Sequence, residues 1–395
     1  MSNNVIDLYL KTHLNHLYLN DIRRLQKRGY KRILLSPILL EKYEFLGKLV
    51  WLLLCISYPI ILFLRIIQGV YYAILSPKQI IDYRNIYLSF SMALPRLVNH
   101  ADVIMDDACC IYHNNYKITS LKNNYSIYQL LSFKDIILAG VCALKAFYKG
   151  VYTYGFETIL YHLFSYHWFL TERVCAKISS KATLYFANHM DEWSVLINNL
   201  DVSRKILFQH GTLIISHNST NIEYPYYNYI KDYKIWTYNL PLKYDNIDVV
   251  YSFTDKEYIA LCSSIVRNVP KKIIVGYSTK ISNVKDNKFS VLIVGEYRTH
   301  AVEEEFIIKS LQNLDINLYL KKHPVEDALL YEDLRNKYEF EFIKNNYYPL
   351  VDVVISYDST LALEYEAAGS LILYYDDFKI DEVIKLVKNI MLKNV

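Results

Sequence analysis

The stretch VVISYDSTLALEYEAAG (Val353–Gly369) decides the fold of this chain, together with the nearby stretch LYLKKHP (Leu318–Pro324). In each stretch a short apolar run typical of a strand ends in polar residues, and a helical pattern follows. Side chains and backbone N–H groups at such a junction lie at the carboxyl edge of a parallel sheet, where open α/β folds bind ligands. The two stretches therefore predict an α/β domain with a ligand site at this edge.

The polar residues after each apolar run indicate a phosphate-bearing ligand. Ser356, Ser359 and Thr360 lie where the N-terminus of a helix presents hydroxyl and N–H groups to an anion. His323 follows a lysine and precedes a proline that can start a helix. Near neutral pH an imidazole can neutralise or protonate a leaving phosphate. We therefore predict that this part of the chain binds a nucleotide.

Length and composition favour a two-domain protein of a reducing compartment. The chain has 395 residues, enough for two domains that each bury a core. Its hydrophobic content of 53% and mean hydropathy of +0.07 are high for a wholly soluble protein. A net charge of +4 gives no case for a dedicated nucleic-acid binder. The six cysteines include no C-x-x-C pair, which argues against a zinc knuckle or a disulfide framework.

The first residues predict the start of a doubly wound sheet. VIDLYL (Val5–Leu10) and RILLSPILL (Arg32–Leu40) have strand character, and the residues between them have helical spacing. The chain therefore opens with a β-α-β unit in this interpretation, and its first residues form a strand rather than a basic-then-apolar leader.

An apolar segment at residues 46–75 predicts a membrane-associating insertion in the first domain. Its uncharged part, LVWLLLCISYPIILFL (Leu49–Leu64), is shorter than the roughly 20 residues that a spanning helix needs, and Pro59 favours a kink. We therefore expect a helix or helical hairpin lying in one leaflet or docked on the membrane surface. The alternatives are a single tilted span and a buried core helix. A preceding basic cluster either attracts anionic headgroups or forms a solvated helix face: Arg23, Arg24, Lys27, Arg28, Lys31 and Arg32.

Further periodic runs divide the chain into an N-terminal domain, residues 1–280, and a C-terminal domain, residues 281–395. The strands expected in the first domain are Asn85–Ser91, Ala101–Asp107, Thr183–Trp193, Lys205–Thr212 and Asp248–Thr254, with a helical region over about residues 127–180. The stretch Lys271–Lys288 is expected to link the domains. A strand–helix alternation then restarts at VLIVGE (Val291–Glu296) and predicts a second parallel sheet.

Three motifs together resemble the GT-B glycosyltransferases of bacterial surface polysaccharide synthesis. They are QHGT (Gln209–Thr212), KKHP (Lys321–Pro324) and S-x-x-S-T-x-x-x-E-x-E-A-A-G (Ser356–Gly369). The resemblance is to CMP-sugar transferases (sialyl-, polysialyl- and Kdo transferases) and to the CDP-glycerol glycerophosphotransferases of teichoic acid synthesis. It implies a GT-B fold, in which two Rossmann-like domains face a cleft and the C-terminal domain binds the nucleotide donor.

The same resemblance implies roles for individual residues of the donor site. His323 would contact the nucleotide phosphate and act as general acid toward the leaving group. Glu364 would hold the ribose hydroxyls. The residues implied to bind the donor are Lys322, Pro324, Ser356, Ser359, Thr360 and Glu364.

The base that deprotonates the acceptor hydroxyl is a three-way choice between His210, Asp107 and Asp191. His210 of QHGT resembles the catalytic histidine of the glycerophosphotransferases, although Gln209 replaces an aromatic residue of that motif. Asp107 belongs to an acidic pair that resembles the acid-acid-Gly motif of sialyltransferases, with Ala108 in place of glycine. Asp191 ends a strand-like run before His210, and it either acts as base or orients the histidine.

These motifs predict an inverting, metal-independent glycosyltransferase (EC 2.4 class) that moves a sialic acid or Kdo type of sugar from a CMP donor. No metal-ligand cluster and no D-x-D motif is found in the sequence, so no cofactor is expected beside the nucleotide-sugar donor. The expected acceptor is a lipopolysaccharide or capsule glycan, and the expected location is peripheral or monotopic at the cytoplasmic side of the bacterial inner membrane. No nucleic-acid partner is expected. The alternatives are a CDP-glycerol or CDP-ribitol phosphotransferase (EC 2.7.8) and a non-catalytic GT-B-like glycan-binding subunit.

Overall fold

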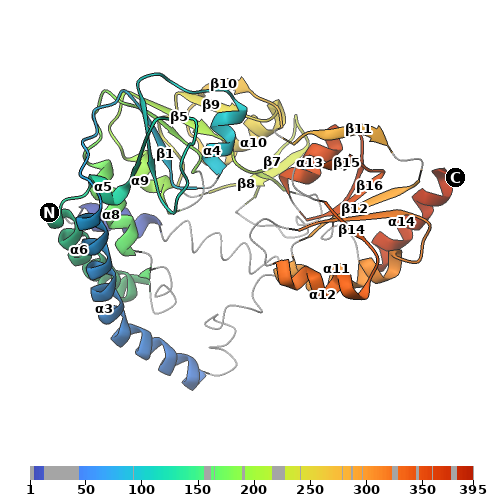
Figure 1. Cartoon of the computed structure of the whole chain (residues 1–395), viewed down its shortest axis with the longest axis horizontal. Coiled ribbons are helices and arrows are strands. Elements are labelled where there is room, and N and C mark those ends of the chain that lie inside the picture. Colours follow the sequence, from blue (N-terminus) through green and yellow to red (C-terminus); the bar gives the residue numbers. More distant parts are fainter. Residues whose placement is uncertain are drawn as a thin grey trace. The chain divides into compact units, whose positions relative to one another are not determined.

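Two compact α/β units make up the chain in the computed structural model (Figure 1). The first comprises Met1–His210 and Asn239–Val275, and the second comprises Gly211–Tyr238 and Gly276–Val395. This grouping differs from the division predicted at residues 280 and 281, because the contacts of Gly211–Tyr238 assign it to the second unit. The structure describes residues 4–12, 44–91, 93–154, 162–163, 165–188, 192–215, 227–240, 242–277, 279–285, 288–295, 297–322, 328–343, 347–357, 359–374 and 380–394.

A seven-stranded parallel sheet forms the core of the first unit. Its strands are β1 (Asn85–Ser89), β2 (Ala108–Tyr112), β3 (Asn123–Ser126), β4 (Thr183–Phe186), β5 (Arg204–Phe208), β9 (Val249–Ser252) and β10 (Lys271–Ile274). Their order in the sheet is β10-β9-β5-β4-β1-β2-β3, and every neighbouring pair is parallel. Because the strand order reverses between β1 and β4, the crevice at the carboxyl ends of these two strands is where a doubly wound sheet binds ligands.

Helices connect and cover these strands. They are α3 (Glu44–Leu75), α4 (Ala93–His100), α5 (Ile127–Leu130), α6 (Phe133–Tyr154), α8 (Ser165–Cys175), α9 (Ser194–Asn198) and α10 (Asp255–Ile265). The helical region predicted over residues 127–180 is confirmed in its described part as α5, α6 and α8. The aromatic residues of α8 pack in the core as expected, since Trp168 and Phe169 are almost fully buried.

The apolar segment at residues 46–75 belongs to one continuous helix, α3, which contains Pro59. The helical-hairpin alternative is therefore wrong. One face of α3 packs on its own unit: the Tyr58 ring stacks on Phe147 of α6 with the ring centroids 4.0 Å apart. The Tyr58 hydroxyl lies 2.6 Å from the hydroxyl of Ser165 in α8. The stacked, hydrogen-bonded tyrosine fixes α3 on the helical layer of the first unit.

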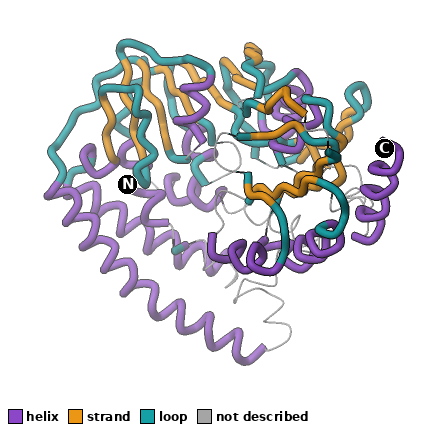
Figure 2. Tube along the Cα trace, turned by 45° about the vertical axis from the view of Figure 1, so that its right-hand side comes forward, coloured by secondary structure: helices purple, strands orange, loops and turns teal. Residues whose placement is uncertain are grey.

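The opposite face of α3 is apolar and exposed. Ile56, Ile60 and Phe63 expose 62%, 61% and 61% of their surface, and they recur at the three- and four-residue spacing of one helix face. In Figure 2 this helix extends from the first unit at the lower left. Two helical segments among the described residues, Leu52–Leu75 and Phe133–Thr153, are long and apolar enough to cross a membrane. Only 17% of the first is buried, against 44% of the second, so α3 presents the larger unpacked apolar surface.

Residues 4–12 form a helix, and the strand predicted at Val5–Leu10 is therefore wrong. The buried apolar positions are Ile6, Tyr9 and Leu10, whose spacing of three and four residues fits one face of a helix rather than the alternation of a strand. The strand predicted at Arg32–Leu40 and the basic cluster before it lie outside the described residues.

The strand predicted at Ala101–Asp107 is also wrong. These residues form a turn and a loop, and β2 begins only at Ala108. Asp102 has a φ of 50°, in the left-handed region, which breaks an extended chain. As a result Asp107 precedes a strand instead of following one.

The second unit is built on a five-stranded parallel sheet. Its strands are β12 (Ser290–Val294), β13 (Asn317–Lys321), β14 (Glu341–Phe342), β16 (Val353–Ser356) and β17 (Leu371–Tyr374), in the order β14-β13-β12-β16-β17. All four pairs are parallel. The connecting helices are α11 (Tyr297–Leu311), α12 (Ala328–Lys337), α13 (Thr360–Ala367) and α14 (Ile380–Asn394). The strand order reverses between β12 and β16, which makes their carboxyl ends the second switch point.

Two smaller sheets complete the second unit. The strands β6 (Ile214–Ile215), β8 (Ile235–Tyr238) and β7 (Tyr227–Ile230) pair antiparallel, and β11 (Ile281–Lys285) pairs with β15 (Tyr348–Leu350). The interdomain linker predicted at residues 271–288 is therefore too long at both ends. Its first residues form the edge strand β10 of the first sheet, and its later residues form strand β11 of the second unit.

The fold class predicted from the sequence is confirmed as α/β, with two Rossmann-like units and an apolar helical insertion in the first. Each large sheet is entirely parallel and reverses its strand order once. The central strands β1, β12 and β16 are buried, which explains their nearly continuous apolar sequences.

Candidate active site

The carboxyl edge of the sheet in the second unit carries the described residues of the predicted donor site. Ser356 is the last residue of β16, and Lys322 directly follows β13. Between them lies β12, whose following residue, Gly295, donates its backbone N–H to the Lys321 carbonyl at 2.8 Å. The ends of three neighbouring parallel strands therefore meet at one edge, as the two sequence stretches predicted.

Ser359 is the N-cap of α13, as its sequence position suggested. Its extended backbone and its Oγ, which accepts a hydrogen bond from the Ala362 N–H at 3.2 Å, are those of a helix cap. Buried Ser356 supports the cap, because its Oγ lies 3.0 Å from that of Ser359. The two hydroxyls thus build the helix start, while the first-turn N–H groups, beginning at Thr360, have no acceptor within the helix.

An anion placed at the start of α13 would be bound by backbone N–H groups and by the helix dipole. Thr360, the first residue of the helix, is half-buried and adds a hydroxyl. Glu364 lies one turn further on, on the same face of the helix as Thr360, and is only 7% exposed. This arrangement puts a phosphate-binding helix end next to a carboxylate that can accept hydrogen bonds from sugar hydroxyls.

Gly295 is a residue of this edge that the sequence analysis missed. A Cβ at this position would lie 2.5 Å from the Tyr331 hydroxyl and 3.1 Å from Glu304 Oε2. Tyr331 and Glu304 are both buried, and the tyrosine hydroxyl donates to that carboxylate at 3.2 Å. The end of β12 therefore needs a glycine for close packing. The signal in the sequence was a glycine directly after a buried strand.

Three of the predicted site residues cannot be compared with the structure. Asp191, His323 and Pro324 lie outside the described residues, and their roles stay predictions. Lys322 is described and half-buried. The amine of its neighbour Lys321 lies over the face of the Tyr348 ring, 5.0 Å from the centroid. Of the two lysines, Lys322 is therefore the better candidate to contact a ligand.

His210 lies at the carboxyl edge of the first sheet, just after β5. Its Nδ1 is 2.6 Å from the backbone carbonyl oxygen of Ala187, which follows β4. A carbonyl only accepts, so Nδ1 holds the proton and Nε2 is the unprotonated nitrogen of the neutral ring. The two strand ends thereby fix both the tautomer and the orientation of the imidazole.

The surroundings of His210 keep its ring neutral. Burial lowers the pKa of the imidazole, the hydrogen bond to Ala187 acts in the opposite direction, and the positive charge of Arg96 lowers it again. Arg96 is an exposed residue of α4, the helix that follows β1. A neutral histidine that carries no proton on Nε2 is the form that a general base requires.

A second histidine, His113, lies at the carboxyl end of β2, next to β1, and it was not among the predicted site residues. It follows β2, stacks on Trp193 with the ring centroids 5.0 Å apart, and has Nε2 2.7 Å from the Thr171 hydroxyl. Phe90, which follows β1, packs edge-on against it. The misplaced strand at residues 101–107 concealed the signal, since His113 directly follows the true strand. Because it is buried and held by these contacts, His113 packs the end of the sheet and has a structural role.

Asp107 lies at the other edge of the first sheet. Its backbone carbonyl accepts from the Asn85 N–H at 3.2 Å, at the start of β1. His210 and Asn188 follow the carboxyl ends of their strands, whereas Asp107 precedes the amino end of β2. A strand of five residues spans roughly 16 Å, so Asp107 and His210 do not face one ligand. Of the three candidate bases, His210 is therefore the one at a ligand-binding edge in the described residues.

Within the described ranges, no group of three His, Cys, Asp or Glu side chains is arranged to hold a metal ion.

Comparison with known proteins gives likenesses at the level of structure alone. No protein-family model and no curated protein matches the chain. Among solved structures the chain is similar to Acinetobacter baumannii MurG, with 9% identity, a TM-score of 0.36, and coverage of 78% of this chain and 90% of that chain. It is also similar to TarM (8% identity, TM-score 0.29, 55% and 49% covered) and to an O-GlcNAc transferase of Thermobaculum terrenum (10%, 0.30, 75% and 54%).

These identities and TM-scores are low. The fold assignment therefore rests on the two parallel sheets, and the site assignment rests on the geometry described above.

Proposed function

We propose that the chain is a GT-B glycosyltransferase that moves an acidic sugar of the sialic acid or Kdo type from a CMP donor onto a lipopolysaccharide or capsule glycan. The observation that supports it is the capped N-terminus of α13 at a switch point, with Glu364 one turn away and with Lys322, which follows β13, at the same edge of the sheet. A helix end binds the phosphate of a nucleotide, and a neighbouring carboxylate binds its ribose. The second unit is thus the donor-binding part of the enzyme.

The proposed reaction is a single displacement that inverts the anomeric centre. The acceptor oxygen attacks the anomeric carbon, the bond from that carbon to the phosphate oxygen breaks, and CMP leaves. The acceptor proton passes to Nε2 of His210 in the first unit, while the start of α13 and His323 stabilise the leaving phosphate. No step requires a metal ion.

A nucleotide panel tests the donor assignment. We expect CMP to raise the melting temperature of the full chain more than UDP or GDP does, because the proposed donor site binds CMP most tightly. A ligand at 100 times its Kd stabilises the native state by about 2.7 kcal/mol. Incubation with CMP-sialic acid and with CDP-glycerol then separates the transferase from the polyol phosphotransferase, since release of CMP is expected from the first alone. Equal stabilisation by all the nucleotides would contradict the proposal.

Ser359→Ala tests the helix end itself. Loss of the cap is expected to destabilise the protein by about 1 kcal/mol, and loss of a fixed N–H array is expected to weaken CMP binding by about fivefold. Thr254→Ala is the matched control, because Thr254 caps α10 of the first unit by accepting from the Glu257 N–H at 3.2 Å. The control should lose similar stability and keep its CMP affinity. If both variants lose CMP affinity equally, α13 is not the phosphate site.

We also propose that the exposed face of α3 holds the enzyme at the cytoplasmic side of the inner membrane. An apolar helix face embedded at the headgroup boundary binds in proportion to its buried apolar area. A triple variant, Ile56→Glu, Ile60→Glu and Phe63→Glu, is expected to reduce flotation with phosphatidylglycerol-containing vesicles at least tenfold. Val269→Glu is the control, because Val269 is 91% exposed and lies outside the helix. Unchanged flotation of the triple variant would contradict the proposed surface.

A further inference from the structure

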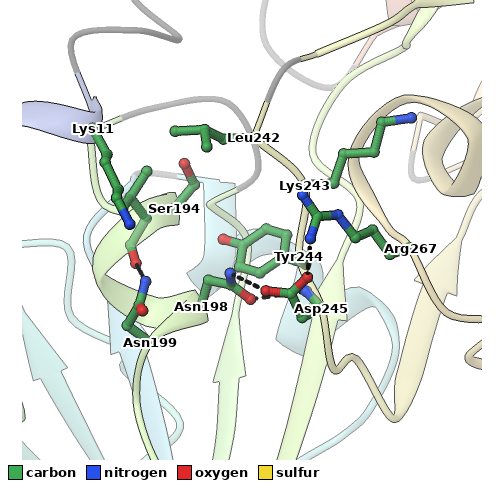
Figure 3. A pocket seen from close by; sticks show the side chains of 10 residues that line it. Lys11, Ser194, Asn198, Asn199, Leu242, Lys243, Tyr244, Asp245 and Arg267 are labelled. Carbon is green, nitrogen blue, oxygen red and sulfur yellow. Dashed lines mark hydrogen bonds and ion pairs between the residues drawn. The ribbon is translucent and has the colours of Figure 1, made fainter. Parts of the chain in front are cut away.

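A small polar pocket in the first unit lies outside the sheet edges described so far (Figure 3). Its volume is about 190 Å³, and its walls come from α9, from the segment before β9 and from the N-terminal helix of residues 4–12. This is below the roughly 300–1,000 Å³ of sites for drug-sized ligands. The pocket therefore fits a single small group, such as one charged sugar residue or a phosphate.

One wall of the pocket is a preformed polar network. The Arg267 guanidinium donates to Asp245 at 2.7 Å, and the Asn198 amide donates to the same carboxylate at 3.2 Å. The backbone N–H of Asp245 donates in turn to the Asn198 side-chain oxygen at 3.0 Å. These bonds join α9 to the segment before β9, so this wall needs no rearrangement when a ligand arrives.

The charged groups around the pocket are three cations and one carboxylate. Lys11, Lys243 and Arg267 are the cations, and Asp245 is the carboxylate. Figure 3 shows the Lys11 amine pointing into the pocket from the side opposite Arg267. The Lys243 amine is held at the rim by the Ser263 carbonyl, at 2.7 Å. The excess of positive charge suits an anion and disfavours an apolar group.

The two cations of one side repel each other in the empty pocket. Burial lowers the pKa of Lys243, and the nearby charge of Arg267 lowers it further. A bound anion would lessen this repulsion by placing a negative charge near both cations. The arrangement is thus more favourable with an anion than without one.

The pocket is joined to the edge that holds the proposed base. Tyr244 lines the pocket, and its hydroxyl donates to the backbone carbonyl of Asn188 at 2.6 Å. The preceding residue, Ala187, has the carbonyl that accepts from His210. Tyr244 and His210 are therefore fixed to adjacent residues of the same strand end. Tyr244 thus connects the pocket to the strand end that carries the proposed base.

We infer that the pocket binds an anionic oxygen group, phosphate or carboxylate, on the glycan acceptor; the link to an acceptor rests on the proposed function. The chemistry of the two groups is shared, since either presents several acceptor oxygens to Lys11 and the Asn198 amide. The pocket would then give the enzyme a preference for acidic glycans.

Direct binding to the full chain tests this without turnover. The probes are glucose 1-phosphate and glucuronate, which distinguish phosphate from carboxylate, with glucose as the neutral comparison. We expect at least one acidic probe to bind and glucose not to bind in calorimetric titrations. Lys11→Gln, at an exposed position, is expected to weaken the acidic probe about tenfold, and Lys243→Gln is the second variant. Lys181→Gln, an exposed lysine away from the pocket, is the matched control and should bind as the wild type does.

The outcomes separate this inference from the proposed function. Loss of acidic-probe binding in Lys11→Gln supports the pocket even if no nucleotide sugar is turned over. Glucose binding as tightly as the acidic probes would overturn the inference, and so would unchanged affinity in both pocket variants. Turnover of acidic and neutral acceptors with equal kcat/KM in the wild type and both pocket variants would also overturn the inference while leaving the transferase assignment intact.

Discussion

Replacing His210 by alanine is expected to lower kcat by about 10²- to 10⁴-fold, the usual contribution of a general base. The reason is geometric: Nδ1 is bonded to the Ala187 carbonyl, which leaves Nε2 as the nitrogen that takes up the acceptor proton. Donor binding should stay unchanged, because it belongs to the other unit. The measurement is single-turnover kinetics with saturating donor, together with CMP affinity from thermal shift.

Three further readouts identify a base rather than a structural histidine. In the wild type kcat/KM should rise with pH below the usual histidine pKa, because burial lowers the pKa of His210. The alanine variant should lose this rise and recover activity when imidazole is added. Asp107→Asn is the matched control and should keep full activity, because Asp107 is at the amino edge of the sheet. Equal losses in the two variants would contradict the assignment of the base.

Acidification from pH 7 to pH 5 is expected to destabilise the first unit by about 4 kcal/mol through two buried histidines. Burial lowers the pKa of His113 to about 3 and that of His162 to about 4. Below the unfolded value near 6.5, the unfolded chain binds these protons and the folded chain does not, so stability falls as the pH falls. Each histidine contributes about 1.4 kcal/mol per pH unit in the window between its two pKa values.

Urea denaturation at pH 7, 6 and 5 measures this slope. His113→Gln keeps a group that can bond to the Thr171 hydroxyl but does not titrate, so its stability should fall less steeply with acid. His100→Gln is the matched control, because His100 is exposed, and its slope should follow the wild type. A slope that is the same for His113→Gln and the wild type would show that His113 does not account for the acid sensitivity.

The strand–helix junction within Val353–Gly369 could be predicted because each of its signals is local. A buried apolar run followed by S-x-x-S-T needs only a few residues to define a strand, a cap and a helix, and Ser359 is indeed the cap. The same local reading failed at Val5–Leu10, where a short apolar run fits either period. It also failed at Ala101–Asp107, where the left-handed Asp102 ends the extended chain.

Features assembled from distant segments could not be predicted in this way. His113 meets Trp193 and Thr171 only through the order of the strands in the sheet. Lys11 and Arg267 line one pocket although they lie near opposite ends of the first unit's sequence. Nothing in the spacing of these residues along the chain indicates that they are neighbours, because their proximity is set by tertiary packing.

The docking of α3 through Tyr58 links membrane attachment to the folding equilibrium of the first unit. Since the helix is packed on α6 and α8, a bilayer that binds its outer face binds only the folded state. Such binding stabilises the native protein by mass action. The proposed membrane attachment would therefore also raise the free energy of unfolding of the first unit.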